Sequence, residues 1–249
     1  MRGLKNCLTK KMLLYLQQNN GGLNMDAINK KLIELYKKYS SEMEDNKEYY
    51  PYLMQCPKEY ENANIKIMFV GNDIENFPKI EKKRKVYVEE AIEKNKEQKE
   101  TPTKRFALLV NKRVNNNHSK GCIVTELFVL GEYTGSSRDI YASDKWEKDN
   151  YAILKKEMEI CAPDCVVFLT QDSHSSDTFL LKGLLGSDII FKPNKNCADI
   201  TLIKNPKIGS KTKISLMIRV PKPNKSSEYL SNEEENIVNI SSELIKKIK

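Results

Sequence analysis

The chain has 249 residues, of which 39% are hydrophobic and 31% are charged, a composition that fits one α/β domain with a core and excludes a disordered tail. The 42 Lys and Arg residues exceed the 34 Asp and Glu residues, and the net charge of +8 suits a polyanionic partner, although solvated lysine-rich helices would give the same balance. No apolar run approaches the roughly 20 residues that cross a bilayer, so we expect no membrane partner and a cytoplasmic protein.

The first predicted elements are two helices, over residues 8–18 and 25–45, which we expect to cover the main fold. In the second of them, Ile28, Leu32 and Leu35 recur at helical spacing. Residues 1–60 are therefore predicted to form an N-terminal helical extension, packed on a core α/β domain that spans residues 61–249.

Strands and helices alternate through the rest of the chain. Apolar runs rich in β-branched residues predict strands over residues 65–71, 121–130, 165–170, 188–191, 199–203 and 213–220. Charged or amphipathic stretches predict helices over residues 79–100, 103–113, 144–161 and 232–248. This alternation is typical of a three-layer α/β/α fold with a mostly parallel central sheet.

In a parallel sheet of this kind, ligands bind beyond the carboxyl ends of the strands. The segments expected at that edge are Gly71-Asn72-Asp73, Thr125-Glu126, Thr170-Gln171-Asp172 and the residues after Val220. The sequence DSHSSD (172–177) is predicted to be a polar loop or a helix cap, because the members of a catalytic triad converge in space and not in one run.

The sequence shows no pattern typical of a bound cofactor. Neither of the glycine-rich phosphate-binding patterns, G-x-x-x-x-G-K and G-x-G-x-x-G, occurs in the chain, so no nucleotide cofactor is expected. The six cysteines form no C-x-x-C pair, and Pro163 lies between Cys161 and Cys165. We therefore expect reduced thiols and neither a zinc site nor an iron–sulfur site.

Four segments carry motifs in a particular order. IKIMFVGND (65–73) is a strand that ends in Gly-Asn-Asp, and GCIVTELFVL (121–130) is a strand with Thr-Glu near its end. ILKKEMEICAPDCVVFLT (153–170) passes from a helix into a strand, and RVPKPN (219–224) ends in Pro-Lys-Pro-Asn. Over roughly residues 60–230 these segments resemble the uracil-DNA glycosylase superfamily, whose members read Gly-Gln-Asp, Thr-Asn and His-Pro at the corresponding places.

The resemblance implies a DNA N-glycosylase that flips a base out of single- or double-stranded DNA and hydrolyses its bond to the sugar. It implies that Asp73 is the carboxylate that stabilises the cation-like sugar and orients water, whereas an Asp that caps the next turn is the alternative. Lys222, where members have His, is the second catalytic candidate, since an ammonium fixed between two prolines would stabilise the departing base or hold a phosphate. A plain surface lysine is the alternative there.

The candidate substrate-binding residues are Gly71, Asn72, Phe77, Tyr87, Glu126 and Asn224. Phe77 or Tyr87 would stack on the flipped base, or else pack in the core. Glu126 stands where members have Asn, and an ionised carboxylate only accepts hydrogen bonds, which suits the exocyclic amine of cytosine. We therefore expect cytosine or a modified cytosine to be excised and not uracil, with an ion pair to a surface Lys or Arg as the alternative role of Glu126.

Two other functions stay open at this point: a catalytically inactive protein of the same fold that binds DNA, and a subunit that binds a protein partner. Asp73 and Glu126 favour the enzyme, because phosphate binding alone has no use for two acids in the cleft. A glycosylase for altered cytosines would suit antiviral defence against viruses with modified DNA.

Overall fold

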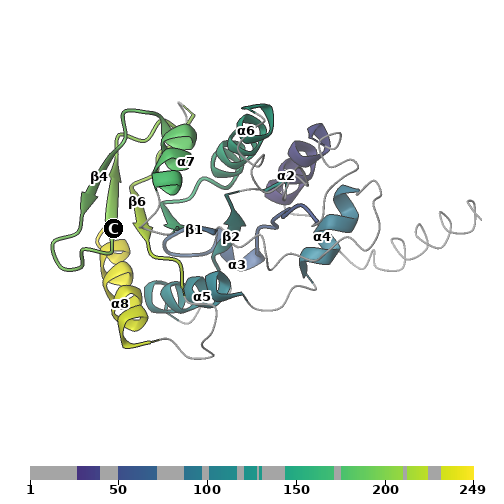
Figure 1. The fold of residues 1–249 in the computed structure, drawn as a ribbon. Coiled ribbons are helices and arrows are strands. Elements are labelled where there is room, and N and C mark those ends of the chain that lie inside the picture. The colour runs from purple at the N-terminus through teal and green to yellow at the C-terminus, as the bar shows by residue number, and fades with distance from the viewer. Residues whose placement is uncertain are drawn as a thin grey trace, which may run out of the picture.

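Six strands form a single sheet in the order β2-β1-β3-β6-β5-β4 in the computed structural model (Figure 1). The structure describes residues 27–39, 50–71, 87–96, 101–116, 121–127, 129–130, 144–170, 175–209, 212–223 and 231–249. The strands are β1 (Ile67–Gly71), β2 (Ile123–Glu126), β3 (Cys165–Leu169), β4 (Ile190–Pro193), β5 (Thr201–Lys204) and β6 (Leu216–Val220).

The sheet has a parallel part and an antiparallel part. β2, β1, β3 and β6 run in the same direction, and the register places Val70 of β1 beside Thr125 of β2 on one side and Phe168 of β3 on the other. β5 and β4 then continue the sheet as an antiparallel hairpin beyond β6. The expectation of a mostly parallel sheet is confirmed. The antiparallel pairing of β5 with β6 and of β4 with β5 was not predicted.

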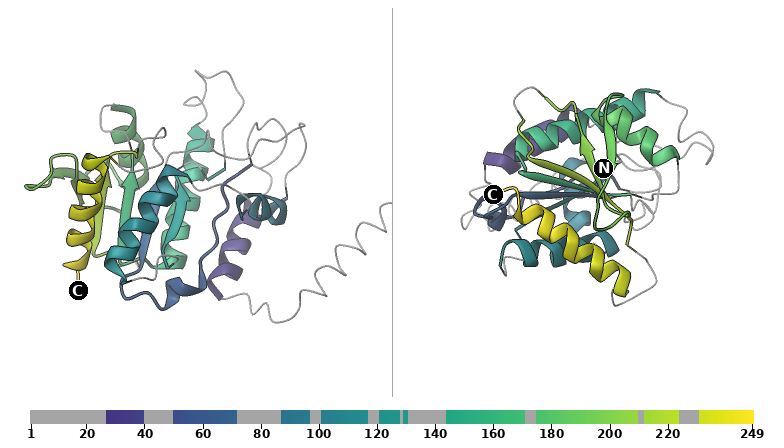
Figure 2. Two further views of the ribbon diagram at one scale, coloured as in Figure 1. Left: turned by 90° about the horizontal axis from the view of Figure 1, so that it is seen from below. Right: turned by 90° about the vertical axis from the view of Figure 1, so that its left-hand side faces the viewer.

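Helices cover both faces of the sheet and make three layers (Figures 1 and 2). One face carries α5 (Pro102–Val114) and α8 (Asn232–Lys246), which pack against each other. The opposite face carries α6 (Asp144–Cys161) and α7 (Ser175–Leu185), and α2 (Ala27–Lys38) packs against α6. The remaining described helices are α3 (Lys58–Glu61) and α4 (Val88–Lys96).

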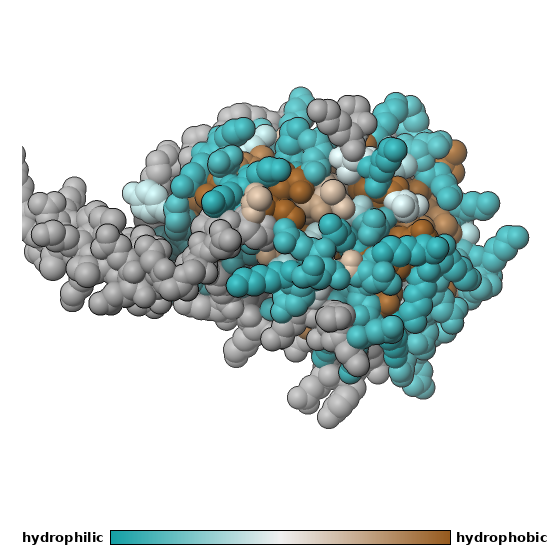
Figure 3. All heavy atoms as spheres, turned by 180° about the vertical axis from the view of Figure 1, so that it is seen from behind, coloured by the Kyte–Doolittle hydropathy of each residue, from teal (hydrophilic) through white to brown (hydrophobic). Residues whose placement is uncertain are grey.

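Alternation along the strands divides the core into two clusters. Met68 and Val70 face the side of α6 and α7, whereas Ile67 and Phe69 face the side of α5 and α8. All four side chains are fully buried, as expected of a parallel strand covered on both faces. The outer surface is different: Figure 3 shows hydrophilic residues over most of the rear face, with apolar residues exposed in small areas between them.

Two helices of the lower layer begin at residues that cap their free backbone N–H groups. Thr101 is the N-cap of α5, its hydroxyl accepts from the Lys104 amide, and Pro102 occupies the first helical position, where a missing N–H has no cost. Ser231 and Glu234 form a capping box at the start of α8. The Thr101 cap fixes where α5 starts, and the first turn of α5 borders the site described below.

Most predicted elements are confirmed, and some are shorter than expected. α6 has the predicted bounds, while the strand predicted over 121–130 ends at residue 126, although Leu127, Val129 and Leu130 stay buried. The helix predicted over 79–100 is described only as α4, and the one predicted over 8–18 lies outside the described residues. α7 begins within the predicted polar loop or cap DSHSSD and continues as a helix.

The chain before residue 61 contributes directly to the larger core cluster. Leu32, Leu35 and Tyr36 of α2 are buried in it, together with Leu53 and Met54 from the segment over residues 50–57. No helix within the described segments has the length and apolar character needed to cross a membrane.

Candidate functional site

The carboxyl ends of the four parallel strands line up along one edge of the sheet. In lateral order this edge carries Glu126 (β2), Gly71 (β1), Thr170 (after β3) and Val220 (β6). The Thr170 amide donates to the Val220 carbonyl over 3.2 Å, so the edge is continuous across β3 and β6. The predicted strand ends therefore meet at a common edge, where parallel sheets bind their ligands.

Gly71 and Glu126 are the closest pair at this edge. They are register partners, and the amide after Glu126, that of Leu127, donates to the Gly71 carbonyl over 2.9 Å. A Cβ placed on Gly71 would lie 2.8 Å from Oε2 of Glu126, 2.9 Å from its Oε1 and 2.9 Å from Cγ2 of Thr103. Glycine is needed here because the Glu126 carboxylate lies directly over its Cα.

Glu126 lies near the first turn of α5. Thr103 is the second helical residue of α5, and its methyl group and the Glu126 carboxylate approach the same position above Gly71. The Glu126 side chain is only 2% exposed. The amino end of a helix carries partial positive charge, so this position stabilises a negative group.

A second buried acid lies on the opposite face of β2. Glu157 of α6 accepts hydrogen bonds from the Tyr36 hydroxyl (2.8 Å) and from the Thr125 hydroxyl (2.9 Å). Burial raises the pKa of Glu157 from 4.5 to about 8, although both hydrogen bonds act to lower it. The Tyr36 hydroxyl also lies 3.4 Å from the Met54 carbonyl. The Tyr36 hydroxyl thus lies between two acceptors, and the Glu157 carboxyl is the nearer of them.

This network joins three segments that are far apart in the sequence. α2 supplies Tyr36, β2 supplies Thr125 and α6 supplies Glu157, which is 121 positions after Tyr36 in the sequence. Because Thr125 directly precedes Glu126, the network holds the end of β2 from the side opposite to α5. It fixes the position of Glu126 and does not itself reach the carboxyl edge.

An extended segment, residues 50–57, lies alongside β2 and leaves a groove of about 370 Å³ between them. The Tyr52 amide donates to the Val129 carbonyl over 2.7 Å, which anchors the segment. Lys104 and Leu108 of α5 and Cys122 and Val124 of β2 line the opposite wall. Burial, followed by the charges of Glu126 and Glu157, raises the pKa of Tyr52.

Thr170 is the one residue of the edge whose polar group is buried without a hydrogen-bond partner among the described residues. The side chain is 1% exposed, and its Oγ1 makes no hydrogen bond within that part of the chain. An unpaired buried hydroxyl costs free energy, and a bound ligand can satisfy it. Sequence reasoning placed Thr170 at this edge but gave it no role.

The other predicted site residues are placed as follows. Lys222 is half-buried, just beyond the end of β6, and β6 is separated from β1 by β3. Tyr87 directly precedes α4 and is 61% exposed. The residues of the prediction that lie outside the described segments are Asn72, Asp73, Phe77 and Asn224. The structure thus brings Gly71 and Glu126 into contact and places Lys222 at the same edge, two strands away from β1.

Glu157, Tyr36 and Tyr52 were not predicted as part of the site. Tyr36 lies in the helix predicted over residues 25–45, but no local pattern pairs it with an acid so far along the chain. In the described part of the chain, no group of three or more His, Cys, Asp or Glu side chains is arranged to hold a metal ion.

The comparisons with known proteins add no family to this description. No protein-family model matches the chain. No curated protein matches it either.

Proposed function

We propose that this protein is a DNA glycosylase that binds a flipped base at the carboxyl edge of its sheet and hydrolyses the bond between base and sugar. The observation that carries the proposal is the buried Glu126 carboxylate, which lies over Gly71 at the end of β1 and against the first turn of α5. The order of the motifs that resemble uracil-DNA glycosylases supports the same assignment.

The chemistry of the edge favours a base with an exocyclic amine. An ionised Glu126 accepts hydrogen bonds and repels a carbonyl oxygen, so it suits the N4 amine of cytosine and not O4 of uracil. The Thr170 hydroxyl, which is buried at the same edge, can donate or accept and is available to a bound base. We therefore propose cytosine or a modified cytosine as the excised base.

Hydrolysis replaces the bond between C1′ of the sugar and the base nitrogen with a bond between C1′ and a water oxygen. The base leaves with the bonding electrons and takes up a proton, and the sugar keeps a hydroxyl group. We assign Asp73, two positions after Gly71 in the sequence, to orient the water and stabilise the cation-like sugar. Lys222 is assigned to the negative charge on the departing base.

The test uses duplex and single-stranded oligonucleotides that carry one uracil, cytosine or 5-substituted cytosine at a defined position. After incubation with the protein, alkali breaks the strand at each abasic site, and the fragments are measured by gel electrophoresis. We expect fragments from a cytosine-type base. Strong release of uracil with none from cytosines would overturn the choice of base.

Variants then test the residue roles. Asp73→Asn is expected to lower the excision rate by about 10²–10⁴-fold, as the loss of a catalytic acid or base does. Glu126→Gln keeps the shape but adds a donor, so uracil release should rise relative to cytosine release. Glu233→Gln, an exposed acid of α8, serves as the matched control for Glu126→Gln. Thr170→Val should weaken oligonucleotide binding.

A second function is a protein of this architecture that binds a base without cutting. It is favoured by one observation: the position at the end of β6 where the resemblance expects His holds a half-buried lysine. Binding of oligonucleotides with no abasic sites from any base, and with unchanged binding by Asp73→Asn, would establish this function in place of the enzyme.

A further inference from the structure

The excess of positive charge is concentrated in one part of the chain. Residues 175–223 contain nine Lys and Arg residues against three Asp residues, and no Glu. This stretch therefore carries +6 of the net +8. The other 200 residues balance 33 basic against 31 acidic side chains, so a general richness in lysine does not explain the difference.

These residues form one end of the molecule, made of α7, the β4–β5 hairpin and β6. Lys182, Lys192, Lys195 and Lys204 are all exposed there, and none of them has an ion-pair partner among the described residues. Lys207 differs, since it pairs with Asp188. The end therefore presents several ammonium groups that no carboxylate in the described chain neutralises.

Three of these ammonium groups belong to the β4–β5 hairpin, and we call them the hairpin lysines: Lys192, Lys195 and Lys204. Lys192 pairs with Leu202 and Lys204 pairs with Ile190, so both lysines project from the same face of the hairpin. Strand geometry puts them roughly 8 Å apart. Ile190 is on the same face, opposite Lys204 and two positions before Lys192, and is 57% exposed.

The tip of the hairpin reaches the carboxyl edge of the sheet. Pro193 pairs with Thr201, and Thr201 pairs with Arg219 of β6, so Lys195 lies beyond the level at which β6 ends. The tip is held by Asn194, whose amide donates to the Ile200 carbonyl over 2.7 Å and whose side chain accepts from the Asn196 amide over 2.8 Å. Lys195 thus lies at the edge that carries Glu126, at its other end, whereas Lys192 and Lys204 lie further from that edge along the hairpin.

We propose that the hairpin lysines bind the phosphate backbone of DNA whose flipped base enters the site at Glu126. The proposal rests on the proposed function for the identity of the polyanion. These exposed ammonium groups run along an ordered hairpin, from Lys195 at the edge of the base site back through Lys192 to Lys204. They fit a chain of phosphates that continues past the site. An acidic membrane surface is the other polyanion that such a patch could meet, and the test separates the two.

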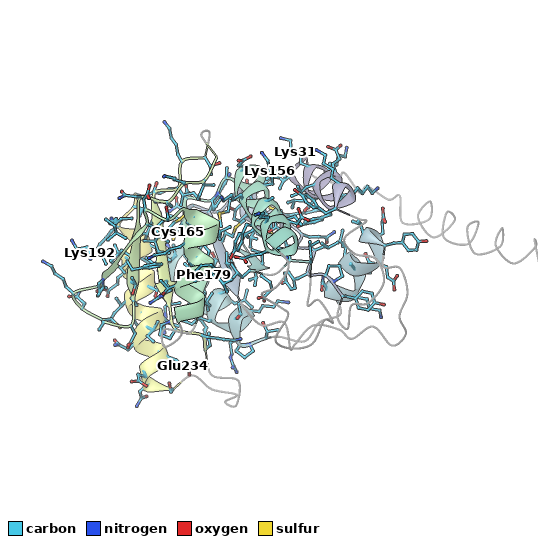
Figure 4. The ribbon with its side chains drawn as sticks, turned by 45° about the horizontal axis from the view of Figure 1, so that its top comes forward. Lys31, Lys156, Cys165, Phe179, Lys192 and Glu234 are labelled. Carbon is cyan, nitrogen blue, oxygen red and sulfur yellow. The ribbon has the colours of Figure 1, made fainter. Side chains whose placement is uncertain are left out.

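The experiment measures binding of a fluorescein-labelled oligonucleotide by anisotropy over a range of salt concentrations. The test variant is Lys192→Glu/Lys195→Glu/Lys204→Glu. The control is Lys30→Glu/Lys31→Glu/Lys38→Glu, which makes the same change of charge on exposed lysines of α2. Figure 4 shows Lys31 well away from Lys192, with α6 and α7 between them.

We expect the hairpin variant to bind at least tenfold more weakly, and the slope of log K against log salt to fall by about 2–3, one step for each lost phosphate contact. The control should lose much less affinity. Equal losses in the two variants, or no loss in the hairpin variant, would overturn the proposal. So would wild-type binding to vesicles with 30% phosphatidylserine but not to DNA.

Unfolding of each variant, followed by circular dichroism, separates lost binding from lost folding. Failure of this inference is also separable from failure of the proposed function. If the hairpin lysines bind DNA but no base is released, only the enzyme assignment fails. If bases are released at an unchanged rate by the hairpin variant at low protein concentration, only the inference about the hairpin fails.

Discussion

The two edge strands of the sheet, β2 and β4, are protected from pairing with other chains in different ways. β2 is accompanied by the segment over residues 50–57, and the acids Glu126 and Glu157 are buried at and behind its end. β4 is exposed at Ile190, Lys192 and Pro193, and only Phe191 is half-buried. Covering and charging are both known means of protecting an edge. The covered edge forms the buried, acidic side of the protein, and the charged edge is left accessible to a partner.

The largest expected contrast is in stability. Leu53 in the segment beside β2 is 1% exposed, whereas Ile190 of β4 is 57% exposed. Leu53→Ala should lower the free energy of unfolding by about 2–5 kcal/mol, because it leaves a cavity. Ile190→Ala should change it by less than about 0.5 kcal/mol. Urea unfolding of both variants measures the difference, and similar values would show that the two edges are equally packed.

The buried acid behind β2 should make stability depend on pH. The pKa of Glu157 is raised to about 8 in the folded chain, so its contribution is fully present below about pH 4.5 and is lost as the pH rises towards 8. The change is on the order of 5 kcal/mol. Melting temperatures of the wild type should fall over this range, and those of Glu157→Gln should fall less. Parallel curves for the two proteins would contradict this role.

The close approach at the ends of β1 and β2 gives the next prediction. Gly71→Ala puts a methyl group 2.8 Å from the Glu126 carboxylate and 2.9 Å from the Thr103 methyl. Overpacking of this kind should cost about 1–3 kcal/mol. Excision should also decrease, because Glu126 is displaced. Chemical denaturation measures the first effect, and the alkali assay measures the second on protein that is still folded.

The smallest effect on stability is expected at the charged edge. Lys192→Val/Lys204→Val should change the free energy of unfolding by less than about 0.5 kcal/mol per site. The same variant should aggregate more readily, because valines beside Ile190 would make a flat apolar edge. Light scattering of the native protein at rising concentration tests this, with Lys30→Val/Lys31→Val on α2 as the control. Unchanged solubility would mean that the lysines do not protect the edge.

The fold was largely predictable because its main elements have local signals. The apolar runs of β1 and β3 lie between clear boundaries, and α6 stops just before Pro163. The direction of β4 and β5 had no such signal, since a short apolar run is the same in either direction. The serines of DSHSSD predicted a cap or a loop, but they gave no sign of helix α7, whose leucines Leu180, Leu181 and Leu184 are buried.

The candidate site was predictable only in part. The rule that ligands bind at strand ends placed Gly71 and Glu126 correctly at one edge. The contact of Glu126 with α5 and the bond between Tyr36 and Glu157 depend on packing between distant segments. The roles of Asp73 and Lys222 stay predictions, and the assays above test them.

In the sequence, the β4–β5 hairpin lies between β3 and β6, although these two strands are neighbours in the sheet. This arrangement also bears on how the chain folds. Parallel pairing of β3 with β6 has to close a loop over residues 170–215, which is entropically costly and slow. β4, β5 and β6 pair in sequence order across connections over residues 194–200 and 205–215, so their contacts are closer in sequence than those of β3 with β6. We expect these three strands to assemble early and to meet β3 as a unit, which makes the hairpin an aid to folding as well as a surface.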